Sequence, residues 1–339
     1  MWPPTGRLRD TQTLSKKNNP RFLIGIDAGG TNIKIMIMTS RFEVTAFNSI
    51  PTGCERGYEI VSDAVIAEIE RMFAENGIGN PAVAAVAMGL PGTVFSVEQK
   101  TGFLSVLMWN DFNPCKKIGE HFNAVYRIDN DANLNALGEY RFGIREQVEN
   151  MILLTIGTGV GGGIIINRQL YRGIKNQAAE FGHMTIAADS DEICLCGQYG
   201  HFESYCSGSA LKRYTLKHLP DYPRSLLNSY MAEKGGYDNA MIDRGVMAGD
   251  PFCTEVFNRY IKYFAIGIGN LMKLFNPELI VIAGGIANAG ELLLAPLREQ
   301  ARTTLMDPDH QGCPIKKSLL GTKAGVYGAC ALAAETAGL

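Results

Sequence analysis

The chain has 339 residues, of which 46% are hydrophobic and 19% charged, so it can build ordinary globular cores and is long enough for about two domains. A formal net charge of -2 argues against a nucleic-acid-binding surface, and the polar first twenty residues contain no apolar stretch for secretion or membrane insertion. We therefore expect a cytoplasmic protein with eight free cysteines, a mobile extension over residues 1–20, and neither a nucleic acid nor a membrane as partner.

Short apolar runs separated by turns indicate an α/β fold. Residues 22–27 are typical of a buried strand, 28–32 of a glycine turn, and 33–38 of a second strand that completes a hairpin. Further elements follow in chain order: a helix around 57–73, a strand around 83–88, a strand at 126–128 and a helix through 132–141.

The pattern of strand, glycine turn and strand recurs in the second half. Residues 151–156 and 164–166 are apolar and flank the glycine-rich segment 157–163. After it come a long helix at 251–275, a buried strand at 279–283 and an alanine-rich terminal helix at 325–337. The repeat predicts two related α/β domains that face one another.

Glycine turns after buried strands let backbone N–H groups approach a phosphate without side-chain obstruction. Three such turns occur, at 28–32, at 157–163 and at Gly284-Gly285. At the first, Asp27 could hold Mg²⁺, Thr31 supplies a hydroxyl, and Lys34 is a cation for a phosphoryl oxygen. Glycines also mark plain hairpin turns, but three glycine turns after buried strands in one chain favour a phosphate site. The first two match neither the Walker nor the dinucleotide-binding pattern, which indicates a nucleotide fold of another kind.

The segment 128–133 ends a predicted strand and opens a helix. Asn130 or Asp131 could simply cap that helix by accepting its free N–H groups. The functional alternative is that Asp131 accepts the proton of a substrate hydroxyl that attacks phosphorus, while Asn130 contacts neighbouring hydroxyls. The spacing alone leaves both interpretations open.

A further turn, at 88–93, follows the strand around 83–88 and contains Pro91-Gly92. Gly92 could let a substrate ring approach the backbone. A tight turn favours Pro-Gly in any case, so a structural role is the alternative.

Between residues 180 and 203 the chain gathers two histidines and two cysteines, with a glutamate at each end. Thiolate and imidazole are ligands that zinc favours, so four side chains could close a structural tetrahedral site: His183, Cys194, Cys196 and His201. A metal there would fix the directions of Glu180 and Glu203, whose carboxylates suit the hydroxyls of a small polar substrate. The alternative is a loop with reduced, half-buried cysteines and an incidental histidine.

Taken in order, these motifs resemble the ROK family of sugar kinases and sugar-responsive repressors. The resemblance runs from about residue 22 to the C-terminus and rests on six motifs: Asp27-Ala-Gly-Gly-Thr31, Gly89-Leu-Pro-Gly92, Asp129-Asn-Asp-Ala-Asn133, Gly157-Thr-Gly-Val-Gly161, Glu180-x-x-His183 and Cys194-x-Cys196-Gly-x-x-Gly. It implies two ribonuclease-H-like domains of the actin and hexokinase type with a cleft between them. We expect the smaller domain at 21–135, joined by a C-terminal helix at 324–339, and the larger at 136–323, with a zinc-binding loop at 180–203.

The resemblance also implies roles for individual residues. Asp131 matches the catalytic base, and the sugar contacts are expected at Gly92, Asn130, Asp131, Glu180, His183 and Glu203. ATP and Mg²⁺ are expected beside Asp27, Gly29, Gly30, Thr31, Asn32, Lys34, Gly157, Thr158, Gly159 and Gly161, with Gly284 and Gly285 near the adenosine. His201 stands where the family usually has a third cysteine, and histidine is a competent zinc ligand.

The activity that the resemblance implies is transfer of the ATP γ-phosphoryl group to the C6 hydroxyl of a hexose. Glucose is the first choice, and N-acetylmannosamine, N-acetylglucosamine, mannose, fructose and allose are alternatives. A regulator is less expected, because only about twenty polar residues precede the first glycine turn, where ROK repressors carry a helix-turn-helix domain. Family members are commonly homodimers or homotetramers, and polyphosphate in place of ATP stays open.

Overall fold

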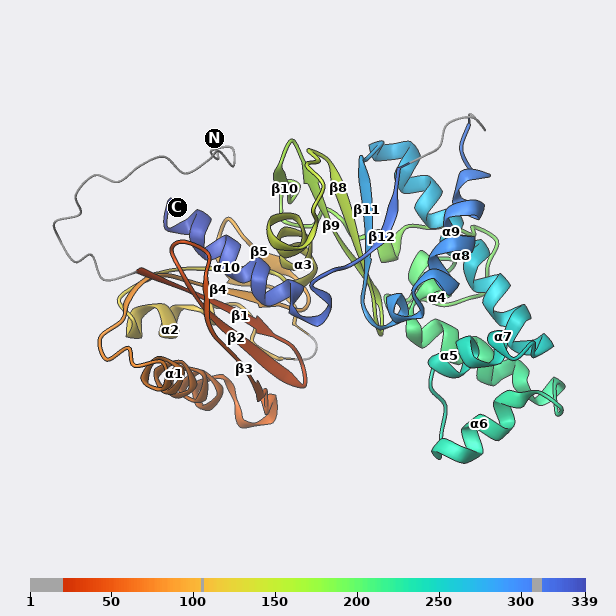
Figure 1. Cartoon of the computed structure of the whole chain (residues 1–339), viewed down its shortest axis with the longest axis horizontal. Coiled ribbons are helices and arrows are strands. Elements are labelled where there is room, and N and C mark those ends of the chain that lie inside the picture. The colour runs from red at the N-terminus through yellow and green to blue at the C-terminus, as the bar shows by residue number, and fades with distance from the viewer. Residues whose placement is uncertain (1–20, 105–106, 307–312) are drawn as a thin grey trace.

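The computed structural model describes residues 21–104, 107–306 and 313–339. Two five-stranded sheets lie side by side, each with its own helices (Figure 1). The predicted extension at 1–20 lies outside these ranges. Within them, no helix combines the length and apolar character needed to cross a bilayer. All eight cysteines are free, as expected.

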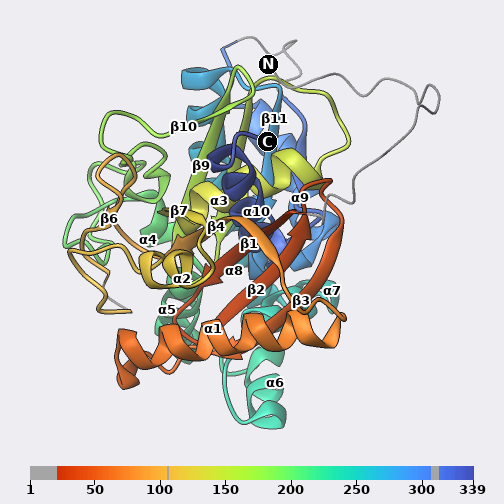
Figure 2. The same cartoon turned by 90° about the vertical axis from the view of Figure 1, so that its left-hand side faces the viewer.

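The first sheet has the strand order β3-β2-β1-β4-β7. Its strands are β1 (Arg21–Ala28), β2 (Asn32–Thr39), β3 (Val44–Pro51), β4 (Ala82–Leu90) and β7 (Val125–Asn130). The first three are antiparallel neighbours, which confirms the hairpin around the first glycine turn, and β4 and β7 are parallel to β1. Helices α1 (Tyr58–Glu75) and α2 (Lys116–His121) pack beside it, with α1 across the front in Figure 2. The small hairpin of β5 (Val94–Phe95) and β6 (Lys100–Thr101) contacts β7.

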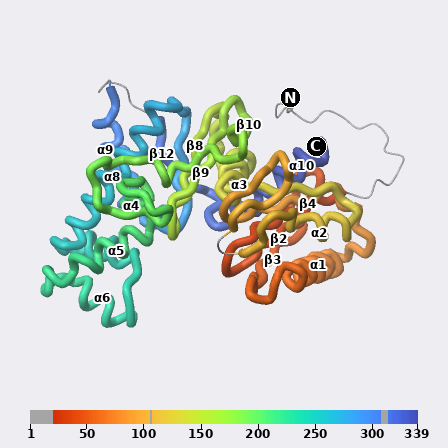
Figure 3. The backbone as a smooth tube through the Cα atoms, turned by 180° about the vertical axis from the view of Figure 1, so that it is seen from behind, coloured from red at the N-terminus to blue at the C-terminus, as the bar shows by residue number. Residues whose placement is uncertain are grey.

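The second sheet repeats this topology in the order β10-β9-β8-β11-β12. Its strands are β8 (Met151–Ile156), β9 (Val160–Ile166), β10 (Gln169–Tyr171), β11 (Leu279–Ala283) and β12 (Ile315–Lys317). Three antiparallel strands are again followed by two parallel ones, so the predicted repeat is confirmed. Its helices are α4 (Phe202–Cys206), α5 (Gly208–His218), α6 (Leu226–Lys234), α7 (Ala240–Met247), α8 (Pro251–Phe275) and α9 (Glu291–Arg302). Seen from behind, α4, α5 and α6 lie on the side away from the first sheet (Figure 3).

The second glycine-rich segment differs from the predicted long turn. Only 157–159 form the turn, because β9 already begins at Val160. A Cβ atom at Gly162 would lie 2.3 Å from the Phe181 ring, and one at Gly163 would lie 2.5 Å from the Cβ of Ala136. These two glycines therefore allow close packing on the strand and lie outside the turn that was predicted to bind phosphate.

Helices α3 (Asp131–Gly138) and α10 (Ala324–Thr336) pack against one another at the junction of the sheets (Figure 1). Helix α3 ends three residues before the end of the predicted helix 132–141, and a single π-helical turn, η2 (Glu139–Gly143), follows it. Leu134 of α3 shares a core with α10 and the first sheet, whereas Ala136 packs on the second sheet. Because α3 contacts both sheets, the division into 21–135 with 324–339 and 136–323 stays a prediction.

Glu139 ties together the two segments that link the sheets. Its side chain is fully buried and accepts hydrogen bonds from the hydroxyl of Ser318 and from the N–H groups of Leu319 and Leu320, the last at 2.8 Å. Residues 139–150 lead from α3 to β8, and residues 318–323 lead from β12 to α10. The buried carboxylate thus holds both crossings in one place.

Candidate active site

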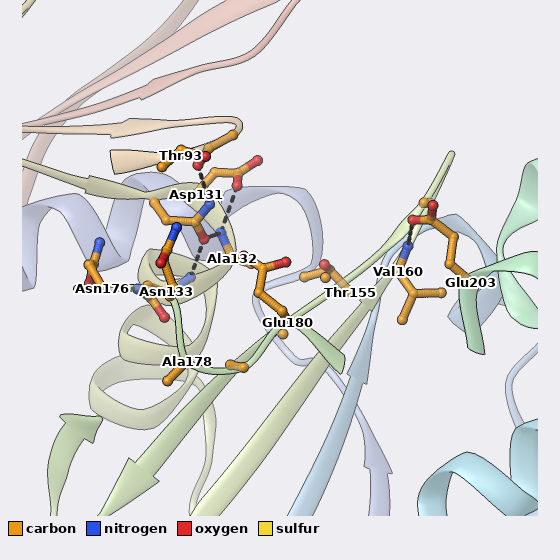
Figure 4. A pocket seen from close by; sticks show the side chains of 18 of the residues that line it. Thr93, Asp131, Ala132, Asn133, Thr155, Val160, Asn176, Ala178, Glu180 and Glu203 are labelled. Atoms are coloured by element: carbon orange, nitrogen blue, oxygen red, sulfur yellow. Dashed lines mark hydrogen bonds between the residues drawn. The ribbon is translucent and has the colours of Figure 1, made fainter. Parts of the chain in front are cut away.

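A cavity of about 340 Å³ lies where the two sheets meet. It is lined by the turn after β4, the start of α3, the β8–β9 turn and the loop before η3 (Phe181–His183). The lining residues are Gly92, Thr93, Asn130, Asp131, Ala132, Asn133, Thr155, Gly157, Gly159, Val160, Gly161, Gly162, Asn176, Gln177, Ala178, Ala179, Glu180, Glu203 and Gly284. Figure 4 shows Asp131 and Glu180 on neighbouring parts of this lining, with Glu203 beside Val160 at the other end.

Asp131 is the first residue of α3 and faces this cavity. Its carboxylate accepts a hydrogen bond from the N–H of Ala132 at 2.9 Å. Burial, and after it the negative charge of Asp27, raises the pKa of Asp131 to about 7, and Glu180 adds a smaller effect in the same direction. A carboxylate with a pKa near neutrality is well matched to accept a proton from a hydroxyl.

Asn130 caps α3, so the capping interpretation applies to this residue. Its Oδ1 accepts hydrogen bonds from the N–H groups of Ala132 and Asn133, at 2.9 and 3.1 Å. Its Nδ2 donates to the carbonyl of Gly92 at 3.1 Å, which joins the two turns at the cavity. Gly92 has φ near 100°, a conformation that favours glycine, so the turn itself needs glycine at this position, as the structural alternative predicts.

The first glycine turn lies apart from the cavity lining. The Nζ of Lys34 is 2.9 Å from Oδ2 of Asp27, so its charge is paired with this carboxylate, and its role as a cation for a phosphoryl oxygen stays a prediction. Thr52, which the sequence did not single out, fixes the turn: its hydroxyl donates to the carbonyl of Gly29 at 2.6 Å, and its N–H donates to that of Thr31.

Glu203 joins the second glycine turn to the cysteine loop. Its Oε2 accepts the N–H of Val160 at 2.9 Å, and its Oε1 lies 3.5 Å from the Sγ of Cys194. A Cβ atom at Gly159 would lie 2.4 Å from the same carboxylate, so glycine is needed for this approach.

The four predicted metal ligands lie together. Their ligand atoms are all within 4.8 Å of one another, with Nδ1 of His183 3.5 Å from Sγ of Cys194 and Nδ1 of His201 3.4 Å from Sγ of Cys196. A tetrahedral zinc with ordinary bond lengths separates a sulfur and a nitrogen ligand by about 3.5 Å. Burial lowers the pKa of His201, which favours the neutral imidazole that binds metals. The donor set therefore fits zinc in both chemistry and spacing.

A second cavity, of about 420 Å³, adjoins the first. Gly157 lines both cavities, while Gly284 lines the first and Gly285 the second. The second is more apolar, with Leu211, Ile242, Phe257, Ile286 and Leu293 in its wall beside the polar groups of Asp238, Asn239 and Asp243. Two cavities that meet at a glycine turn suit a small polar molecule in the first and a nucleoside in the second, with the phosphates of the nucleotide at the turn between them.

The structure brings together most, but not all, of the predicted residues. Absent from the lining of either cavity are His183, Thr158 and the first-turn residues Asp27, Gly29, Gly30, Thr31, Asn32 and Lys34. The sequence missed several lining residues, among them Thr93, Thr155, Asn176, Gln177, Asn239 and Asp243. Two of these carried a signal: Thr155 is a polar residue in an apolar strand before a glycine turn, and Thr93 ends the turn at 88–93 that the sequence singles out.

Comparisons with known proteins agree with this geometry. The family model described as "ROK family" matches residues 23–336. The chain is 30% identical to a glucokinase of Halalkalibacterium halodurans over 311 residues, which cover 91% of this chain and 93% of that one. It is also 29% identical to a xylose repressor of Caldicellulosiruptor bescii, over 91% of this chain and 77% of the repressor.

Solved structures show the same fold. A ROK family glucokinase from Streptomyces griseus, in complex with glucose and AMPPNP, is 31% identical with a TM-score of 0.75, over 93% of this chain and 99% of that one. A ROK hexokinase from Thermus thermophilus is 28% identical with a TM-score of 0.77, over 92% and 97%. The two-domain fold of the actin and hexokinase type is thereby established, and the chain belongs to the ROK family.

Proposed function

We propose that the protein transfers the γ-phosphoryl group of ATP to the C6 hydroxyl of a hexose, and that glucose is the preferred acceptor. The observation that carries this function is the position of Asp131, which faces a cavity of monosaccharide size next to a second, more apolar cavity. Similarity to the glucokinase of H. halodurans and to the glucose complex from S. griseus supports the choice of acceptor.

The hexose occupies the first cavity, with its reacting hydroxyl at Asp131. Asn130, Glu180 and Glu203 hold the other hydroxyls, and Gly92 lets the ring approach the backbone. Asp131 accepts the proton as the hydroxyl oxygen bonds to phosphorus, and the bond to the ADP oxygen breaks. His183 would act on the sugar through the metal-linked loop, since it does not line the cavity.

The nucleoside occupies the second cavity, and its phosphates pass the turn at Gly157 and Gly159 toward Asp131. Asp27, with Lys34 beside it, would hold Mg²⁺ through water, and the bound cation would neutralise charge on the phosphates. Gly284 and Gly285 leave room for the nucleotide at the junction of the cavities.

The cluster of His183, Cys194, Cys196 and His201 would hold a structural zinc ion. Four protein ligands leave no open position for a substrate, so zinc would supply folding energy to the loop and not chemistry to the reaction. With two thiolates and two neutral imidazoles, such a site carries no net charge beside Glu203.

The test is a coupled assay of ADP release across glucose, mannose, fructose, allose, N-acetylglucosamine and N-acetylmannosamine, with polyphosphate as an alternative donor. The expected result is turnover with ATP and the highest kcat/KM for glucose. A higher kcat/KM for an N-acetylhexosamine would change the proposed acceptor but not the proposed kinase activity. Sugar binding with no turnover on any acceptor would reject the kinase and favour a sugar-responsive regulator.

A further inference from the structure

Asp129 precedes the two polar residues at the start of α3, but its side chain does not line either cavity. Only 1% of Asp129 is exposed. Its Oδ2 accepts from Nε of Arg172 at 2.6 Å, and its Oδ1 accepts from Nδ2 of Asn133 and of Asn176, each at 3.1 Å. A buried carboxylate with three side-chain donors is costly to desolvate and well compensated, so its partners are held firmly.

The donors come from both halves of the molecule. Asp129 lies near the end of β7, an edge strand of the first sheet, and Asn133 lies one helical turn later in α3. Arg172 directly follows β10, the edge strand of the second sheet. Asn176, in the same loop, also donates to the carbonyl of Val94 in β5 at 2.9 Å. We name these four side chains the Asp129 clasp: Asp129, Asn133, Arg172 and Asn176. It links the facing edges of the two sheets.

The loop that the clasp holds is closed on itself. The N–H of Ala178 donates to the carbonyl of Arg172 at 3.1 Å, and Asn176 has φ of 57°. Asparagine adopts this left-handed backbone more readily than most residues other than glycine, and three hydrogen bonds fix its side chain. Because the loop is compact, the positions of Arg172 and Asn176 fix the positions of the residues that follow them.

Those residues form one wall of the first cavity. Asn133 and Asn176 of the clasp already line it, Gln177, Ala178, Ala179 and Glu180 continue the wall, and His183 follows in the metal cluster. Glu180 therefore lies between two anchors, the clasp on its N-terminal side and the Cys/His cluster on its C-terminal side.

We propose that Asp129 is a positioning residue that sets the acceptor-binding wall 177–180 against Asp131, an inference that rests on the proposed kinase function. Asp129 does not touch the substrate. It acts through Arg172 and Asn176, and so it determines affinity for the hexose and leaves the nucleotide cavity on the far side of Gly157 unchanged.

The experiment compares Arg172→Met, Arg172→Lys and Asn176→Gly with the wild type. Asn176→Gly removes the three side-chain hydrogen bonds of Asn176, with Asp129, Asn133 and the carbonyl of Val94, while glycine adopts the left-handed backbone freely, so it keeps the loop foldable if Arg172→Met does not. Because Asn176 also lines the first cavity and Arg172 does not, Arg172→Met is the variant that separates positioning from the loss of a direct contact. Arg168→Met is the matched control, because Arg168 is on the same hairpin and pairs with the exposed Glu149. The measurements are KM for glucose, KM for ATP, kcat, and the rate of tryptic cleavage after the exposed Lys175 in the native protein without ligand.

We expect KM for glucose to rise about 10- to 100-fold in Arg172→Met and Asn176→Gly, because a small displacement of a substrate-binding wall has effects of that size. KM for ATP should change less than about twofold, Arg172→Lys should lie between, and cleavage after Lys175 should become about tenfold faster as local opening becomes easier. Arg168→Met should match the wild type in all four measurements.

Two outcomes would overturn the positioning role. One is unchanged KM for glucose and unchanged cleavage after Lys175. The other is an equal rise in both KM values or a loss of kcat alone, which marks a general structural defect. If no protein, wild type included, phosphorylates any hexose while cleavage after Lys175 still accelerates in the variants, the kinase function fails and the clasp remains as a loop anchor only.

Discussion

The N–H of Val160 donates to the carboxylate of Glu203 at 2.9 Å, and the same carboxylate lies 3.5 Å from the thiol of Cys194. Glu203 therefore contacts the turn proposed for phosphate and the cluster proposed for zinc. A change at the cluster can reach the phosphate turn through one side chain.

The first prediction concerns this link. Glu203→Gln keeps the shape of the side chain but replaces one acceptor oxygen by an amide donor and removes the charge. We expect KM for both glucose and ATP to rise, each by about tenfold, which corresponds to the loss of about 1.4 kcal/mol from a charge-assisted bond. Zinc content measured by plasma emission spectroscopy should stay at the wild-type level. A rise confined to glucose would mean that Val160 does not depend on Glu203.

The second prediction concerns the metal. Purified protein should contain about one zinc per chain, and His183→Ala should lose it, since three ligands bind a structural zinc more weakly than four. Removal of zinc by a chelator should lower affinity for glucose in a calorimetric titration without nucleotide. His201→Cys should keep the metal, and His121→Ala, at an exposed histidine paired with Glu70, is the control. A wild-type protein free of zinc after careful purification would contradict the site.

The third prediction concerns the base. Asp131→Asn should lower kcat by about 10²- to 10⁴-fold, because the amide cannot accept the proton of the hydroxyl. Binding of glucose, measured by calorimetry, should change little. Near-normal turnover in this variant would reject Asp131 as the base.

The fourth prediction follows from the pKa of Asp131, which is raised to about 7. The base must be ionised, so kcat/KM should rise with pH up to about 7 and then level. The effect of pH on stability has the opposite sign. The unfolded chain ionises this carboxyl near pH 3.9, whereas the folded protein keeps it protonated up to about pH 7. The folded state therefore loses stability as pH rises from about 4 to 7.

Asp131→Asn removes that loss of stability. Its Tm should equal the wild-type value near pH 4 and exceed it at pH 8, by about 1–2 °C for each kcal/mol regained in a chain of 339 residues. Differential scanning calorimetry across this pH range gives the comparison. A Tm difference that does not grow with pH would contradict the raised pKa.

The fifth prediction concerns the contact of α3 with α10. A Cβ atom at Gly328 would lie 1.8 Å from the carbonyl oxygen of Leu134. Gly328→Ala should therefore destabilise the protein by about 1–3 kcal/mol or more, although alanine is the better helix former. Urea denaturation measures the change, with Gly79→Ala as control because nothing lies within 4 Å of a Cβ there. Equal stability of the two variants would show that the helices can separate without cost.

The sequence predicted the fold well where the chain repeats itself. The hairpins around the first two glycine turns and the strand at 279–283 are local patterns of apolar runs and turn residues, and the structure confirms them. The cluster of His183, Cys194, Cys196 and His201 was also predictable, because its ligands are close in sequence.

The missed features depend on long-range contacts. Gly162 looked like part of a phosphate turn, but its function in packing against Phe181 appears only when η3 reaches β9. Likewise Asp129 and Arg172 are separated by more than forty positions and meet only when two sheet edges face each other. The sequence analysis also did not predict the ion pair of Lys34 with Asp27, which depends on the cross-strand register that places these residues opposite one another.

The packing of α10 on the first sheet has a consequence for biogenesis. Leu23 and Met36 share a core with Val326 and Cys330, so the sheet that leaves the ribosome first is covered by the helix that leaves it after β12. The nascent N-terminal strands therefore keep one apolar face exposed to solvent until α10 has been synthesised, while the second half of the chain forms its own core. Truncation before α10, or slow release of the finished polypeptide, would therefore expose that face to chaperones or to aggregation.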